Sequence, residues 1–461
     1  MSTKATPPET AVATAQSNSK APKKKASSVR HTRAIQRDRS KRPAGAPPPE
    51  QIETQLTEFV HPATLAQLDY YKRLGLRERV LTLPVMVGLV LSMVWRQIGG
   101  VSELTRLLRG EKMLWVEPLQ VSQQAVAERL TSLPAELFER ILQAVLLQMH
   151  LRCGARQRPV PVEIAWARAH FSQLLIVDGS TLDALLRKLK MLRDKPEHPL
   201  AGRMMAVLDL GSRLPHRLWY TPQANKHDQG FWPDILAAVT AGSLLIFDLG
   251  YTNYKVFGQL TAAGVTFLTR AKRNQVSEVI RTFCRTATVH DQLIWLGGGD
   301  HRQQVRLIEV LYHGTWYRYL TNALDPAQMP VGYAVALYWQ RWRIEDAYAI
   351  VKRLLGLAYF WTGGENGIQL QLWATWLLYA MLVDLTDAVA AELNRPVADL
   401  SLEMVYRSLF HFPHVYQRGE ASDVIAWVAA NAKWLGVLKR PRKRLDEKRL
   451  ALTQLMETQS A

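Results

Sequence analysis

The stretch "SQLLIVDGS" at Ser172–Ser180 decides the fold, because four large apolar residues run directly into an aspartate. Short apolar runs of this kind are typical of buried strands. A second stretch, "SLLIFDLGY" at Ser243–Tyr251, repeats the pattern with Asp248 in place of Asp178. We expect each strand to end at its aspartate, which brings the two carboxylates together at one edge of a sheet.

The segments around these two strands alternate between strand and helix patterns. Strand-like runs are "MMAVLDLGS", "HRLWYTPQ" and "VTFLTRAK", and "FWPDILAAVTAG" has helical spacing. This alternation predicts an α/β domain with a mixed sheet. Between Arg285 and Asn322 the runs "QLIWLGG", "QVRLIEVLYH" and "WYRYLTN" are strand-like with no helical signal among them, so they predict an inserted β element. After Met329 the pattern returns to long helices, including Leu370–Val383.

Both ends of the chain are basic. Residues 1–50 contain Lys and Arg eleven times against three Asp and Glu, with seven prolines, which predicts a disordered arm that binds phosphates weakly. Residues 51–170 have helical spacing, and Val121–Leu142 could hold a helix-turn-helix, although helix pairs with short turns are also common packing units. The predicted regions are an arm (1–50), a helical domain (51–170) for which the possible helix-turn-helix indicates DNA binding, an α/β domain (171–384) with its β insertion at about 273–328, and a C-terminal helical region with a basic tail (385–461).

Composition indicates a globular protein with a polyanionic partner. The chain has 461 residues, 48% of them hydrophobic, and 58 Lys and Arg against 40 Asp and Glu, a formal net charge of +18. The longest apolar run, Leu81–Trp95, is shorter than the ~20 residues needed to span a bilayer, so we expect a buried helix and no membrane insertion. With two cysteines, no metal-ligand spacing and no secretory signal, a cytoplasmic location is expected.

The stretch "YWQRWRIEDAYAIVKRLLGL", Tyr338–Leu357, carries charge where an amphipathic helix would border a core. At about 100° per residue, Tyr338, Arg341, Glu345 and Lys352 fall on one narrow stripe beside apolar positions. The simpler alternative is a solvated face on which Arg341 and Glu345 form an ordinary ion pair one turn apart.

Asp178, Asp248 and Glu345 together suggest a metal site. Each aspartate alone could instead cap a backbone amide in a turn that ends its strand. Three carboxylates that lie close together repel one another unless cations neutralise them, and oxygen ligands without His or Cys suit Mg²⁺ or Mn²⁺. Two such ions about 4 Å apart would promote phosphoryl transfer. Tyr338, Arg341 and Lys352 would then hold a DNA phosphate.

The spacing Y-x2-R-x3-E-x6-K at Tyr338, Arg341, Glu345 and Lys352, with "VDGST" and "FDLGY" upstream, resembles the signature of bacterial DDE transposases of the insertion-sequence-four family. The resemblance covers roughly residues 173–357. It implies a ribonuclease-H-like catalytic core with a β-rich insertion, preceded by a helical N-terminal domain and followed by C-terminal helices.

The resemblance also implies site residues and partners. Asp178, Asp248 and Glu345 would be the catalytic triad that binds two Mg²⁺ ions, or Mn²⁺, and Tyr338, Arg341 and Lys352 would contact DNA. The implied activity is metal-dependent strand cleavage at insertion-sequence ends and strand transfer into target DNA. The implied partners are double-stranded DNA, as terminal inverted repeats and target, and a second copy in a homodimeric synaptic complex. An aromatic in the insertion can stack on a flipped base in such enzymes, and no motif decides between Trp295 and Trp316.

Other enzyme classes find less support. None of the twelve histidines has an arginine three positions later, which excludes a tyrosine recombinase, and no phosphate-binding loop motif of nucleotide hydrolases occurs. His227 in "NKHDQG" is interpreted as a loop residue, or as one that contacts the metal-binding residues without binding the metal itself. Two alternatives stay open: a ribonuclease-H-like DNA nuclease without strand transfer, and a non-catalytic DNA-binding protein derived from a transposase.

Overall fold

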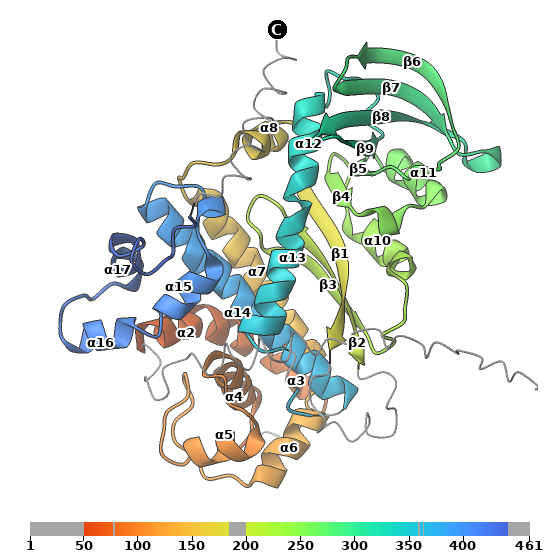
Figure 1. Ribbon diagram of the computed structural model, residues 1–461. Helices are drawn as coiled ribbons and strands as arrows, with labels where there is room; N and C mark the ends of the chain where they lie inside the picture. Colours follow the sequence, from red (N-terminus) through yellow and green to blue (C-terminus); the bar gives the residue numbers. More distant parts are fainter. Residues whose placement is uncertain (1–49, 77–78, 184–199, 358–359, 363, 441–461) are drawn as a thin grey trace, which may run out of the picture.

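The computed structural model describes residues 50–76, 79–183, 200–357, 360–362 and 364–440. The predicted basic arm and most of the predicted basic tail lie outside these ranges. Within them, one mixed sheet has helices on both faces, and further helices precede and follow it in the chain (Figure 1). This architecture confirms the predicted α/β class.

The sheet is continuous from the predicted core into the predicted insertion. Its described strands run in the order β3-β2-β1-β4-β5-β9-β8-β7-β6. β1 pairs parallel with β4, and β4 pairs parallel with β5, whereas every other neighbouring pair is antiparallel. The strands are β1 (Leu174–Asp183), β2 (Leu200–Asp209), β3 (Pro215–Thr221), β4 (Leu244–Phe247), β5 (Thr266–Arg270), β6 (Ser277–Arg285), β7 (Val289–Leu296), β8 (Gln303–Tyr312) and β9 (Thr315–Thr321).

Apolar residues on both faces of the central strands explain their burial. In β1, Leu174 and Ile176 face one core, whereas Leu175 and Val177 face the other, because successive side chains of a strand point to opposite faces. The second, smaller core lies under α10 and α11 (Figure 1). The elements on this side are the 3₁₀ turn η1 (Asp228–Phe231), α10 (Trp232–Ala238), the 3₁₀ turn η2 (Leu249–Tyr251) and α11 (Tyr254–Ala262).

The larger core joins helices from both ends of the chain. N-terminal α7 packs along C-terminal α14, and α12 and α13 follow one another beside β1 (Figure 1). The N-terminal helices therefore share one core with the sheet and do not form a separate body. The helices are α2 (Glu50–Leu65), α3 (Leu68–Arg73), α4 (Leu83–Trp95), α5 (Val101–Leu107), α6 (Gln123–Ser132), α7 (Glu136–Ala155), α8 (Val162–His170), α12 (Val331–Trp339), α13 (Arg343–Ala349), α14 (Glu365–Glu392), α15 (Leu402–Ser408), α16 (Phe412–Gln417) and α17 (Val424–Ala430).

A cluster of ion pairs fastens the end of α7 to α14. Arg156 bonds Asp384 (2.6 Å) and Asp387 (3.1 Å), Arg152 reaches Asp384 (3.3 Å), and Arg158 pairs with Asp387. Both aspartates are buried, so each charge depends on its partners. The predicted domain boundary after residue 384 falls inside α14 at this cluster.

The structure does not support α7 as the recognition helix of a helix-turn-helix. Such a helix needs a free N-terminus to enter the major groove. Here the backbone N–H of Ala135, just before α7, donates to the side chain of Asn366 at the start of α14 (3.0 Å), and one face of α7 is buried against α14. The pair α6 and α7 is therefore a packing unit, which was the alternative reading of Val121–Leu142.

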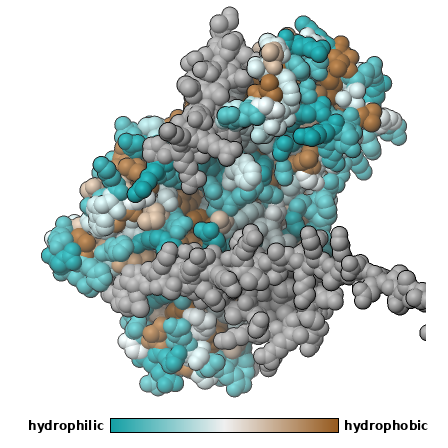
Figure 2. Space-filling model, viewed as in Figure 1, coloured by the Kyte–Doolittle hydropathy of each residue, from teal (hydrophilic) through white to brown (hydrophobic). Residues whose placement is uncertain are grey.

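Hydrophobic helices are covered by protein. α4 is buried, as predicted for the apolar run Leu81–Trp95. Among the described residues, α14 is the one helix long and apolar enough to cross a membrane by length and composition, yet 89% of its most apolar window is buried inside the protein. The face seen in Figure 2 is mainly hydrophilic where it is coloured, with hydrophobic residues in small separate groups.

Candidate active site

Asp178 lies inside β1, which continues to Asp183. The prediction that this strand ends at Asp178 was wrong. The reason is that β1 has different partners on its two edges: the parallel ladder with β4 stops at Val177, whereas the antiparallel ladder with β2 carries on past Asp178. The change from apolar residues to Asp178 in the sequence therefore corresponds to the end of pairing with β4, and not to the end of the strand.

Asp248 follows β4 directly and lies next to Asp178. Val177 is paired with Phe247, so Asp178 lies one residue past the last pair within β1, and Asp248 lies one residue past it after the end of β4. Strand alternation in β1 places Asp178 on the face that is covered by α12 and α13. The hydroxyl of Tyr338, on α12, donates to Asp248 Oδ1 (3.3 Å), so Asp248 reaches the same side. The predicted convergence of the two carboxylates is thus present in the fold.

The segment with the four signature residues is not one regular α-helix. It consists of α12, a 3₁₀ turn (Gln340–Trp342, η4), α13 and a π turn (Ile350–Leu354, η5). The stripe expected at 100° per residue is therefore only approximate, since a 3₁₀ turn and a π turn change the rotation per residue. Single π turns inside helices occur often at functional sites.

Arg341 joins two of the predicted triad residues. Its guanidinium donates from Nη1 to Asp178 Oδ2 (3.2 Å) and from Nη2 to Glu345 Oε1 (2.9 Å). The residue is only 5% exposed, which is not the solvated ion pair of the simpler sequence reading. Within the described residues its buried Nε–H has no acceptor. A buried donor without a partner is costly, so this position favours a further acceptor, supplied by water or by a ligand.

Lys352 and Tyr338, the other two signature residues expected to contact DNA, also form hydrogen bonds within the protein. Lys352 Nζ donates to the Thr181 carbonyl (2.9 Å) and lies 3.3 Å from Ser180 Oγ. Tyr338 is held by Asp248, as described above. Contacts of Tyr338, Arg341 and Lys352 with DNA phosphates therefore stay a prediction. In the DNA-free chain Tyr338 and Arg341 bond to the acidic residues, and Lys352 bonds to β1.

Negative charge is concentrated around Asp178. Burial raises the pKa of the Asp178 carboxyl to about 6, although the Gly179 N–H (2.8 Å) and Arg341 oppose this, and the charges of Asp228 and Asp248 add to it. The Gly179 contact is the local backbone cap that the sequence allowed as an alternative. The cap and the acidic cluster coexist, because one carboxylate can accept several hydrogen bonds.

The carboxylate oxygens around Asp178 are of the type that binds a hard divalent ion, but in this structure the acidic residues are not close enough together to bind one. Within the described part of the chain, no group of three or more His, Cys, Asp or Glu is placed to hold a metal ion. One guanidinium, that of Arg341, bridges Asp178 and Glu345 and supplies the positive charge there. Carboxylate oxygens without nitrogen or sulfur ligands suit Mg²⁺ or Mn²⁺, provided that Arg341 releases its two bonds.

Sequence reasoning missed two residues of this site. Tyr348 donates to the backbone carbonyl of Asp178 (2.6 Å), and its position three residues after Glu345 could have revealed it by helical spacing. Asp228 lies against Gly179 on the other face of β1, and nothing local in the sequence marks that contact. His227 caps η1, its Nδ1 accepting from the Gln229 N–H (3.2 Å), in line with its reading as a loop residue.

The aromatic candidates of the insertion are occupied by neighbouring side chains. The guanidinium of Arg302 lies 4.8 Å from the ring of Trp295, and Trp316 stacks on His290 (4.5 Å between ring centroids). Neither arrangement selects one of them. Trp342, outside the insertion, is more exposed than Trp316: it is 58% exposed, and the guanidinium carbon of Arg341 lies 5.1 Å from its ring centroid.

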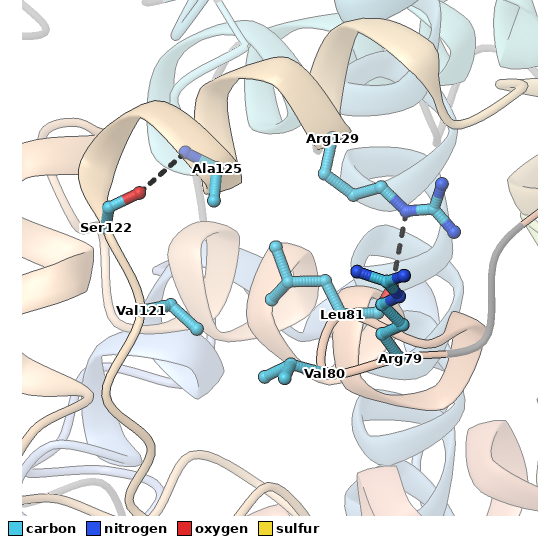
Figure 3. A pocket seen from close by; sticks show the side chains of 7 residues that line it. All are labelled: Arg79, Val80, Leu81, Val121, Ser122, Ala125 and Arg129. Atoms are coloured by element: carbon cyan, nitrogen blue, oxygen red, sulfur yellow. Dashed lines mark hydrogen bonds between the residues drawn. The ribbon is translucent and has the colours of Figure 1, made fainter.

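A hollow of about 340 Å³ lies away from these residues, between the start of α4 and the start of α6 (Figure 3). Ser122 caps α6 there, and Arg129 Nε donates to the carbonyl of Leu81 (3.2 Å). None of its lining residues is a predicted site residue. The lining residues are Arg79, Val80, Leu81, Val121, Ser122, Ala125 and Arg129.

Comparison with known proteins points in one direction. Residues 169–381, just under half of the chain, match the family model of the transposase DDE domain. The chain is similar to y4zB of Sinorhizobium fredii, a protein named as a transposase by inference. The two are 29% identical over 219 residues, which cover 45% of this chain and 59% of y4zB. The chain thus spans less than two thirds of that relative's length. The matched region holds every predicted site residue and the whole of the sheet.

Proposed function

Because residues 169–381 match the family model of the transposase DDE domain, we propose that this protein is a transposase that cuts DNA at the ends of an insertion sequence and joins those ends to target DNA. Membership of the insertion-sequence-four family is part of the proposal and rests on the spacing of Tyr338, Arg341, Glu345 and Lys352. Cut-and-paste transposition requires cleavage and strand transfer at one acidic site, which the proposal assigns to Asp178, Asp248 and Glu345.

The observation that carries the proposal is that Asp178 within β1 and Asp248 directly after β4 are adjacent, with Glu345 linked to Asp178 through Arg341. A structural ion pair would need one carboxylate for each arginine. Here Arg341 holds two carboxylates, those of Asp178 and Glu345, and Asp248 follows the neighbouring strand; burial further disfavours the charged form of Asp178. Two partly exposed carboxylates on one arginine, with a third acid beside them, support a site that holds cations.

Asp178, Asp248 and Glu345 would hold two Mg²⁺ ions, or Mn²⁺. When bound, the ions would supply an activated nucleophile and stabilisation of the leaving oxygen. The protein's own residues would hold the DNA. Arg341, released from its carboxylates, can direct its planar fork and its free Nε–H to phosphate oxygens, whereas Lys352 offers a point charge beside Thr181.

Double-stranded DNA is the proposed partner, as terminal inverted repeat and as target. The excess of basic residues supports this, since each neutralised phosphate releases counterions. We assign DNA binding to the helical region 51–170 and to the basic ends, without a helix-turn-helix at α6 and α7. A homodimeric synaptic complex and a DNA-associated cytoplasmic location complete the proposal.

The test uses a labelled duplex that carries the inverted repeat flanking the protein's own gene, with and without Mg²⁺. Asp178→Asn, Asp248→Asn and Glu345→Gln should each abolish cleavage while DNA binding persists, because each removes a charged ligand. Asp346→Asn is the matched control. Asp346 is an exposed acid next to Glu345, and this variant should cleave the duplex normally. Cleavage with joining supports a transposase, and cleavage without joining supports a nuclease. Absence of cleavage by the unaltered protein would contradict both.

A further inference from the structure

The turn η1 lies behind the two aspartates, on the opposite face of the sheet. Alternation along β1 points Asp178 toward α12 and α13, and it points Gly179 toward α10 and η1. Asp228, the first residue of η1, places its carboxylate against Gly179. It therefore touches the backbone next to Asp178 without sharing that residue's face of the sheet.

Gly179 is the residue that makes room for this carboxylate. A Cβ atom at position 179 would lie 2.1 Å from Asp228 Oδ1 and 3.0 Å from its Cγ, closer than side-chain atoms approach. The glycine is thus required by a neighbour and not by a turn, since it sits within a strand. Arg203 on β2 fixes the carboxylate, donating from Nε to Oδ1 (2.7 Å) and forming an ion pair through Nη2.

The next residue of η1 reaches the second aspartate. Gln229 Nε2 donates to the backbone carbonyls of Gly250 (3.0 Å) and Thr252 (3.1 Å), which belong to the turn directly after Asp248. One short turn is therefore bonded to the backbone after Asp248 through Gln229, and its Asp228 lies against Gly179, next to Asp178, while it is bonded to Arg203.

These contacts lie where the sheet itself stops joining the two strands. The parallel ladder between β1 and β4 runs from Leu174 and Leu244 to Val177 and Phe247, and ends before the aspartates. Beyond that point no bridge between β1 and β4 sets the distance between the two carboxylates. The η1 turn spans this gap from behind.

We propose that Asp228 and Gln229 are positioning residues that set the spacing of Asp178 and Asp248. Gly179 leaves the space that the Asp228 carboxylate needs. The inference rests on the proposed function, in which the two aspartates bind divalent ions. Residues that orient metal ligands from outside change metal affinity when they are altered, whereas residues that only stabilise the fold change stability.

The experiment measures Mn²⁺ binding by the full-length protein without DNA, by titration calorimetry and by electron paramagnetic resonance, next to thermal unfolding. Asp228→Asn and Gly179→Ala should each raise the Mn²⁺ dissociation constant by about tenfold to a hundredfold with little change in unfolding temperature. Asp234→Asn is the matched control: this exposed aspartate lies in the first turn of the next helix, α10, and the variant should bind Mn²⁺ like the unaltered protein.

A double-variant comparison separates positioning from a general loss of structure. If Gly179 matters because Asp228 needs its space, Gly179→Ala should weaken Mn²⁺ binding in the unaltered background and add little in an Asp228→Ala background. Gln229→Met tests the second arm of the turn and should weaken Mn²⁺ binding too, which keeps the proposal testable if Asp228 variants fold poorly.

The outcomes are distinguishable. Unaltered Mn²⁺ affinity in Asp228→Asn and Gly179→Ala, or a lower unfolding temperature with normal affinity of the folded protein, overturns the positioning role alone. Failure of the unaltered protein to bind Mn²⁺, or normal binding by Asp178→Asn, overturns the proposed function and this inference with it.

Discussion

A buried ion pair in the inserted strands gives a sharp prediction about stability. Arg306 on β8 is fully buried and Asp291 on β7 is 2% exposed. Arg306 donates from Nε and Nη2 to the two carboxylate oxygens (2.7 Å each) and from Nη1 to the carbonyl of Met329 (2.6 Å). Because Met329 lies just before α12, the pair ties the insertion to the helix that carries Tyr338.

Asp291→Ala removes both carboxylate acceptors and leaves a buried guanidinium with the Met329 carbonyl. Breaking a buried pair from one side costs about 3–5 kcal/mol, since the remaining charge loses its compensation. Urea unfolding followed by circular dichroism should show this loss. Replacing both partners by Asp291→Leu with Arg306→Met should recover most of the stability, because no charge is then left in the core.

The matched control is Glu420→Ala, which breaks an ion pair of similar length between two exposed residues, Glu420 and Arg418. It should leave the unfolding curve unchanged, because exposed pairs are screened by solvent. If Asp291→Ala costs less than about 1 kcal/mol, or if the double variant is no better than the single one, the guanidinium is not held in a dry core and the reasoning fails.

Further predictions concern the site, the thiols and the basic arm. Lys352→Met should slow single-turnover cleavage by about tenfold to a hundredfold with unchanged Mn²⁺ affinity, because on the proposed function it removes a phosphate contact and no metal ligand. Normal cleavage would contradict that phosphate contact. Tyr338→Phe should lower cleavage by about fivefold to tenfold at limiting Mg²⁺, since one hydrogen bond to a carboxylate is lost. Burial, with nearby negative charge, raises the pKa of the Cys153 thiol to about 12, so iodoacetamide at mildly alkaline pH should label partly exposed Cys284 first, and Cys153 should gain thiolate only near its own pKa; equal labelling of both would contradict its burial. Removing residues 1–49 should weaken binding to all duplexes and reduce its dependence on salt concentration, and a loss of sequence discrimination instead would show that the arm reads bases.

The sequence predicted those parts of the fold in which local pattern and tertiary burial agree. The runs before Asp178 and Asp248 are apolar on both faces because the strands lie between two cores, so their type and their adjacency could be predicted. Strand β6 was missed since its residues are mostly exposed and carry no alternation. Helix α11 was missed because only three of its nine residues are buried, which is a short signal.

For the site, the sequence predicted which residues meet but not what they do to one another. The spacing of Tyr338, Arg341 and Glu345 indicated a common stripe, yet it could not show that Arg341 turns to Asp178, since this depends on the 3₁₀ turn and on the position of β1. Asp228 lies 49 residues after Gly179 (228 − 179), and no local period relates them. Contacts of this kind come from topology.

The common core of α7, α14 and the sheet has a consequence for where DNA would be cut. A recognition module on a flexible tether can swing, and its distance from the reactive residues then varies. Here the N-terminal helices are locked to α14 by apolar packing and by the ion pairs of Asp384 and Asp387, so they cannot rotate as a separate unit. If these helices hold the DNA end, their distance from the acidic residues is constant. The number of base pairs between the bound sequence and the cleaved phosphate is then fixed by the structure of the protein.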